Sequence, residues 1–173
     1  MRIIISDSSC LIDLHKGGLL EAIFGLPYSF AMPQPLFEEE LLSISDEEKA
    51  MLIASGMEVT VLPGEHVTTA MDYYNENRRL KLNDCFALVL AETTEESILF
   101  TGDQPLRQLA ETKEIETHGV LWAIDEILKH TDIDRQLILD ALILFYEDPL
   151  VRLPEDELKR RIRRLKKSLK DNE

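Results

Sequence analysis

The stretch LNDCFALVLAE, residues 82–92, is apolar around almost its whole circumference when it is drawn as a helix. A helix that is apolar on every side is buried inside a protein, because no face of it suits water. Asp84 nevertheless stands in the first turn of this helix, where a charge without a partner is costly to bury. The stretch therefore predicts a central, buried helix with one polar end, and the rest of the chain must explain the carboxylate there.

Short apolar runs alternate with helix-like runs on both sides of this stretch. Strands are predicted at RIIIS, YSFAM, MEVTVL, SILFT and EIETH, which are residues 2–6, 28–32, 57–62, 97–101 and 114–118. Helices are predicted near residues 8–16, 33–44, 46–55, 65–80, 83–93, 104–112 and 119–130. This alternation indicates an α/β fold, with a parallel sheet covered by helices on both faces.

The chain length of 173 residues suits one domain with a helical extension. The alternation of strands and helices stops after residue 130, and helical patterns then cover residues 132–148 and 154–170. We therefore expect an α/β domain over residues 1–130 and a C-terminal helical extension, with a basic final helix, over residues 131–173.

The charge of the chain is strongly negative and uneven. The formal net charge is −14, yet residues 151–173 carry +4, so the first 150 residues carry −18. A body this acidic repels nucleic acid at long range, which excludes a non-specific coat protein for DNA or RNA. The charge is compatible with a carboxylate-rich metal site and with a basic protein partner.

Cysteine usage and hydropathy place the chain among cytoplasmic proteins. Cys10 and Cys85 are far apart in apolar segments, and no CxxC pair or zinc-ligand spacing occurs, so both are predicted to be reduced core residues. No apolar run approaches the roughly 20 residues that a membrane helix needs. We expect a soluble protein without a membrane partner.

Acidic residues recur where predicted strands end or the next helices begin. Asp7 ends the first strand, Asp103 follows the fourth, Asp84 opens the central helix, and Glu38–Glu40 lie in the helix after the second strand. Ligands of parallel α/β sheets bind at the carboxyl edge of the strands, where these residues should meet. Each acid alone could be a helix cap or a solvated residue. Four acids in one crevice would repel each other unless a cation joined them, and oxygen ligands select Mg²⁺ or Mn²⁺.

Four segments in order, IISDSSCLIDL, MPQPLFEEEL, LNDCFALVLA and ILFTGDQPLR, resemble the motif set of PIN-domain ribonucleases, including VapC-type toxins of bacterial and archaeal toxin–antitoxin pairs. The resemblance runs over about residues 2–125 and includes HGVLWAIDEIL. It implies a three-layer α/β/α sandwich with a mostly parallel central sheet. It also implies an acidic quartet that binds Mg²⁺ or Mn²⁺ and hydrolyses RNA phosphodiesters.

Matching the motifs position by position implies roles for individual residues. Asp7, Asp84 and Asp103 match catalytic aspartates that bind the metal, and Ser9 and Thr101 match small polar positions near the metal or the scissile phosphate.

The family glutamate has two candidates in this chain. Counting from Pro33 favours Glu39. Helical phase favours Glu40, because Phe37, Leu41 and Ile44 should face the core and the family glutamate usually just precedes such a leucine. Both stay candidates for the catalytic acid, with Glu40 favoured as the metal ligand.

The resemblance leads us to expect a metal-dependent endoribonuclease with an RNA substrate. It could be the toxin of a toxin–antitoxin pair, with a small basic antitoxin as a partner and a homo-oligomeric state. The alternative is a catalytically silent PIN-like module that binds protein or RNA. A phosphatase with an aspartyl nucleophile is disfavoured, because SDSSC lacks the second aspartate of a DxD pair.

The final helix carries an apolar stripe with basic residues on its other faces. Leu158, Ile162, Leu165 and Leu169 are spaced by 4, 3 and 4 residues. In one interpretation the stripe docks on the same chain. In the other, the helix is an arm that holds RNA phosphates or pairs with a second subunit, since two heptads are too short for an isolated coiled coil.

Overall fold

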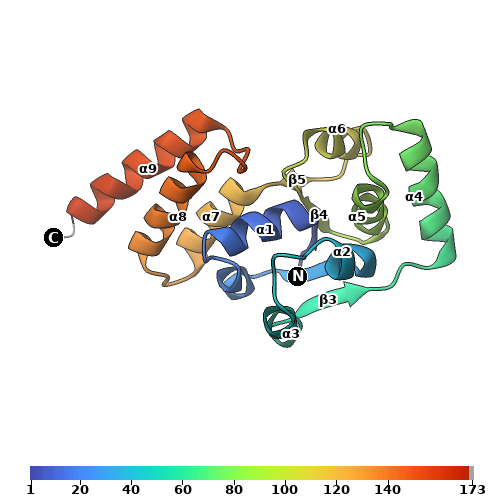
Figure 1. Cartoon of the computed structure of the whole chain (residues 1–173), viewed down its shortest axis with the longest axis horizontal. Coiled ribbons are helices and arrows are strands. Elements are labelled where there is room, and N and C mark those ends of the chain that lie inside the picture. The colour runs from blue at the N-terminus through green and yellow to red at the C-terminus, as the bar shows by residue number, and fades with distance from the viewer. Residues whose placement is uncertain (172–173) are drawn as a thin grey trace.

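The computed structural model describes residues 1–171 and contains one sheet of five parallel strands in the order β3-β2-β1-β4-β5 (Figure 1). The strands are β1 (Ile3–Ser6), β2 (Ser29–Pro33), β3 (Met57–Thr60), β4 (Ser97–Phe100) and β5 (Thr117–His118). Helices flank this sheet, so the predicted α/β/α sandwich with C-terminal helices is confirmed. From β1, the strands β2 and β3 are added on one side and β4 and β5 on the other, so the strand order changes direction between β1 and β4. Such sheets bind ligands at the carboxyl ends of the two strands at this point.

Nine α-helices and one 3₁₀ helix surround the sheet within residues 1–171. They are α1 (Ser8–Lys16), η1 (Glu21–Gly25), α2 (Gln34–Glu39), α3 (Asp46–Ala54), α4 (Gly64–Glu76), α5 (Leu82–Thr93), α6 (Gln104–Thr112), α7 (Val120–His130), α8 (Arg135–Glu147) and α9 (Glu155–Lys170). Helix α5 packs across β1, β2 and β4, and Figure 1 shows α1 and α7 on the other side of the sheet. The seven residues Cys85–Ala91 of α5 are all buried, as the apolar stretch predicted.

The central strand β1 is buried and fixes the register of its neighbours. Ile5 is fully buried and pairs with Ala31 of β2 and Leu99 of β4. Ser6 pairs with Phe100, so the residues after these two strands, Asp7 and Thr101, emerge side by side at the carboxyl edge. Both cysteines are buried and free, as the sequence predicted.

Two predicted elements are at most half as long as expected. The helix predicted at residues 33–44 ends at Glu39, because residues 40–45 form the turn that leads to Ser45, which caps α3 in a capping box with Glu48. The strand predicted at residues 114–118 begins at Thr117. Glu114 has a φ of 58° and Ile115 N–H bonds back to the carbonyl of Ala110, so the turn that ends α6 occupies the first half of the predicted strand.

The C-terminal helices share the core of the α/β domain. In α8, Ile138, Leu142 and Phe145 are at most 1% exposed. A Cβ atom at Gly17 would lie 2.7 Å from Cζ of Phe145, so only glycine allows α8 to approach the end of α1 this closely.

Helix α9 packs on α8 through its apolar stripe, with Leu158 and Leu165 buried. Arg161 of α9 also donates to Asp125 of α7, with Nε 3.1 Å from Oδ1. The interpretation in which the stripe docks on the same chain is therefore confirmed. None of the described helices combines the length and the apolar character that crossing a membrane requires.

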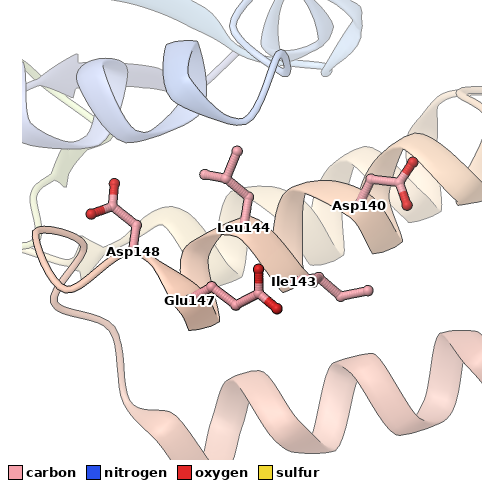
Figure 2. A pocket seen from close by; sticks show the side chains of 5 residues that line it. All are labelled: Asp140, Ile143, Leu144, Glu147 and Asp148. Carbon is pink, nitrogen blue, oxygen red and sulfur yellow. The ribbon is translucent and has the colours of Figure 1, made fainter.

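The outer side of α8 is an acidic surface with an apolar centre. A hollow of about 460 Å³ is lined there by Asp140, Ile143, Leu144, Glu147 and Asp148. Figure 2 shows that Leu144 and Asp148 point toward the side where α1 lies. The Asp148 carboxylate is 3.3 Å from Nζ of Lys16, at the end of α1.

Asp13 of α1 lies close to this pair and is destabilised in its charged form. Its pKa is raised to about 6, mainly because burial disfavours the carboxylate and further because Asp148 is negative, while Lys16 acts in the opposite direction. The folded protein therefore holds this proton more tightly than the unfolded chain. The free energy of unfolding therefore falls as the pH rises from about 4 to 6 and Asp13 ionises, and the whole loss is present above pH 6.

We predict that Asp13→Asn stabilises the protein at pH 7.5 by about 1 kcal/mol, a value below the full two-unit shift because the carboxyl is partly solvated. The gain should decline below pH 6 and vanish below pH 4, where Asp13 is protonated in both states. Urea unfolding at pH 7.5 and 5.0 measures it, with Asp72→Asn on the exposed face of α4 as the control. A gain that is equal at both pH values would contradict this account of Asp13.

Candidate active site

The carboxyl ends of β1 and β4 bring two of the predicted aspartates together. Asp7 follows β1 and caps α1, and Asp103 follows β4 by three residues and caps α6, with Leu106 N–H donating to its Oδ1 at 2.8 Å. Each caps a helix at the edge where two parallel strands end. The capping role and the location at the ligand-binding edge are therefore compatible for both residues.

Asp7 is held in one orientation by two hydroxyl groups. Asp7 is only 3% exposed. Its Oδ2 accepts hydrogen bonds from Ser9 Oγ at 2.8 Å and from Thr101 Oγ1 at 2.7 Å. Thr101 is fully buried and its Oγ1 also accepts from the backbone N–H of Asp103 at 3.0 Å. The two predicted small polar residues thus contact Asp7 directly, and Thr101 links it to Asp103.

The structure brings Glu40, and not Glu39, to this edge. Glu40 Oε1 accepts from Asn83 Nδ2 at 2.9 Å, and its Oε2 accepts from the hydroxyl of Ser8. Glu39 is exposed on the outer side of α2. Glu38 is exposed as well and accepts from Gln34 within the same helix. The early end of α2 therefore leaves Glu40 at the helix terminus, turned toward α1 and α5.

Asp84 is close enough to the other three acids to be affected by their charges. Its Oδ2 accepts from the backbone N–H of Lys81 at 2.7 Å, which anchors the carboxylate at the start of α5. The pKa of Asp84 is raised to about 6, first because burial disfavours its charge and then because Asp7, Asp103 and Glu40 are negative. The polar end of the buried helix therefore lies near the other three carboxylates.

Asp7, Glu40, Asp84 and Asp103 form what we call the carboxylate cluster. All of its donor atoms are oxygens, and their mutual repulsion would be relieved by a divalent cation, so the donor set fits Mg²⁺ or Mn²⁺. Within residues 1–171, however, no three Asp, Glu, His or Cys side chains stand close enough together to enclose a metal ion as they are. A shared cation would therefore require these side chains to lie closer together than they do here.

Two residues of this region were missed by sequence reasoning. Ser8 and Asn83 each contact Glu40, and they connect it to α1 and α5. Their positions in the sequence could have indicated them, because each is a polar residue directly beside a predicted acid, at the start of an otherwise apolar helix.

A comparison with protein-family models identifies the family of the chain. No curated protein matches the chain. A family model described as PIN domain matches residues 3–167, which includes α8 and most of α9 and so extends well past residue 125, where the resemblance in the motifs ended. Because the match covers nearly the whole chain, and the parallel sheet agrees with it, this chain belongs to the PIN-domain family and has a nuclease-type fold.

Proposed function

We propose that the chain is a metal-dependent endoribonuclease, with Mg²⁺ or Mn²⁺ held by Asp7, Glu40, Asp84 and Asp103. One observation carries this proposal: four carboxylates from four segments gather at the carboxyl edge of a PIN-domain sheet, where burial and then the charges of the other three raise the pKa of Asp84. Repulsion of this kind is unfavourable for the empty fold, so the cluster is better explained by a cation than by stability.

The chemistry follows from the properties of a divalent cation and from the residues that fix its ligands. When bound, the metal would supply positive charge that attracts a phosphodiester. It would also lower the pKa of a water molecule, so that this water can lose a proton and attack the phosphorus. Ser9 and Thr101 orient Asp7, and Ser8 and Asn83 orient Glu40, through the hydrogen bonds described above. Partners that orient metal ligands in this way typically change metal affinity or activity by about 10–100-fold.

The proposal extends to the biological role. The resemblance to VapC-type toxins and the charge of −18 over the first 150 residues support a toxin whose partner is a small basic antitoxin. A homo-oligomer is part of the same proposal. Expression of the wild-type chain should then arrest growth and expression of Asp7→Asn should not, while an upstream reading frame for a small DNA-binding protein would identify the partner.

Purified protein should cleave single-stranded RNA when Mn²⁺ is present and stop when EDTA is added, because the carboxylates alone cannot activate water. Gel analysis of several RNAs of different sequence measures this. Cleavage that persists in EDTA would contradict a metal mechanism. RNA binding without cleavage of any of these substrates would favour the catalytically silent module.

The Asp7→Asn variant should lose at least about 100-fold in ribonuclease activity and bind Mn²⁺ more weakly, because a neutral amide is a poor ligand for a hard cation. The fold should persist, since asparagine still accepts from Ser9 and Thr101. Calorimetric titration with Mn²⁺ and circular dichroism test both statements. Equal Mn²⁺ binding by the variant and the wild type would remove Asp7 from the metal site.

The two glutamate candidates can be separated by matched substitutions. Glu40→Gln should reduce activity by about tenfold or more, the scale expected for a metal contact, whereas Glu39→Gln should stay near wild type. Initial rates at a fixed Mn²⁺ concentration, with Mn²⁺ titrations of both variants, measure the difference. Equal losses in the two variants would mean that neither side chain is a metal ligand.

A further inference from the structure

A cavity of about 640 Å³ lies directly beside the carboxylate cluster. Asp103 lines it, together with Arg107, His118, Trp122 and Arg152. Its volume is within the roughly 300–1,000 Å³ of pockets that bind small ligands. Its wall combines residues from the start of α6, the start of α7 and the linker before α9, three segments that are far apart in the sequence.

Arg107 presents unused hydrogen-bond donors to this cavity. Its Nη1 donates to the backbone carbonyl of Thr101 at 3.2 Å, and a Cβ atom at Gly119 would lie 3.4 Å from the same nitrogen. Among residues 1–171, no carboxylate lies within 4 Å of the Arg107 guanidinium. A guanidinium has five N–H donors, so most of those on Arg107 are available to an anion.

Arg152 is the second cation of the cavity. It is exposed in the linker between α8 and α9, and within the described part of the chain it too has no carboxylate partner. Arg107 and Arg152 therefore line the same cavity. Arginine is suited to phosphate because its planar fork can bind two phosphate oxygens at once.

The same cavity has an aromatic wall. The rings of His118 and Trp122 are stacked, with centroids 4.2 Å apart and planes 11° apart. Trp122 also contacts Tyr28 and Phe100, at centroid distances of 5.6 and 6.5 Å, so its position is fixed by the core. Rigid aromatic rings next to arginines are the combination that proteins use to stack bases and hold phosphates of single-stranded RNA.

We propose that this cavity binds one nucleotide of the RNA, adjacent to the phosphodiester at the carboxylate cluster. Arg107 and Arg152 bind its phosphate, and the ring pair of His118 and Trp122 receives its base. The N-terminal turn of α7 faces the same cavity and favours a negative charge there, whereas the N-terminus of α6 is already capped by Asp103. This inference rests on RNA being the substrate, and it identifies where an acidic protein gains affinity for a polyanion.

Trp122 is the single tryptophan of the chain, so its fluorescence reports on the cavity without any need for cleavage. Adenosine 5′-monophosphate, added in EDTA with excitation at 295 nm, should change this fluorescence in a saturable way. Arg107→Gln and Arg152→Gln should each weaken the nucleotide by about tenfold, the scale of one charge-assisted contact. Lys129→Gln is the matched control, because Lys129 is exposed at the opposite end of α7.

The cleavage assay gives a second readout. Arg152→Gln alters only an exposed side chain, and it should raise KM for RNA about tenfold with kcat nearly unchanged. The slope of log affinity against log salt concentration should also become less steep by about one unit. Lys129→Gln should match the wild type in both quantities.

The outcomes separate this inference from the proposed function. Nucleotide binding that needs the arginines, in a protein that cleaves no RNA, would keep the subsite and reject the ribonuclease. Normal cleavage with a KM unchanged by Arg152→Gln would keep the ribonuclease and reject the subsite. Inorganic phosphate that binds as tightly as the nucleotide, or a fluorescence that no nucleotide changes, would also overturn the subsite.

Discussion

The fold has to support like charges at one edge of its sheet, where burial and then the three neighbouring acids raise the pKa of Asp84. Asp7, Glu40, Asp84 and Asp103 come from four separate segments, and each is anchored by hydrogen bonds from hydroxyl, amide or backbone groups. These donors offset part of the cost of gathering like charges. Parallel strands make the arrangement possible, because they deliver the ends of β1 and β4 to the same edge. A buried helix, α5, then presents Asp84 from beneath.

Much of this arrangement could be predicted from the sequence, because it follows from local patterns of polar and apolar residues. Strand ends locate Asp7 and Asp103, and the apolar circumference of α5 makes Asp84 conspicuous. Helical phase favours Glu40 over Glu39, and the structure turns only Glu40 toward the cluster. Leu41 and Ile44 are buried, as the phase argument assumed, although they lie in the turn that follows α2 and not in the helix itself.

The rest could not be read from local patterns, because it depends on contacts between distant segments. Arg107 follows a predicted acid by four residues, and no motif in the sequence distinguishes it from other arginines. Arg152 lies in a linker without any helical or strand periodicity. Only the packing of α8 and α9 on the α/β core brings Arg152 to the cavity beside Asp103. The net charge suggested that RNA would be repelled, but a total charge says nothing about where the unpaired cations lie.

The position of the α8–α9 linker also has a consequence for the order in which the protein is made. Synthesis runs from the N-terminus, so the four acids are present once residue 103 has been added, and the sheet is complete soon after. Arg152 and its neighbours reach the cavity only when α8 packs on α1 and α9 packs on α8. A nascent chain on the ribosome would therefore form its carboxylate cluster before the cavity beside Asp103 is complete. Under the proposed function, the segment that carries α8 and α9 would set the moment at which the protein can bind RNA.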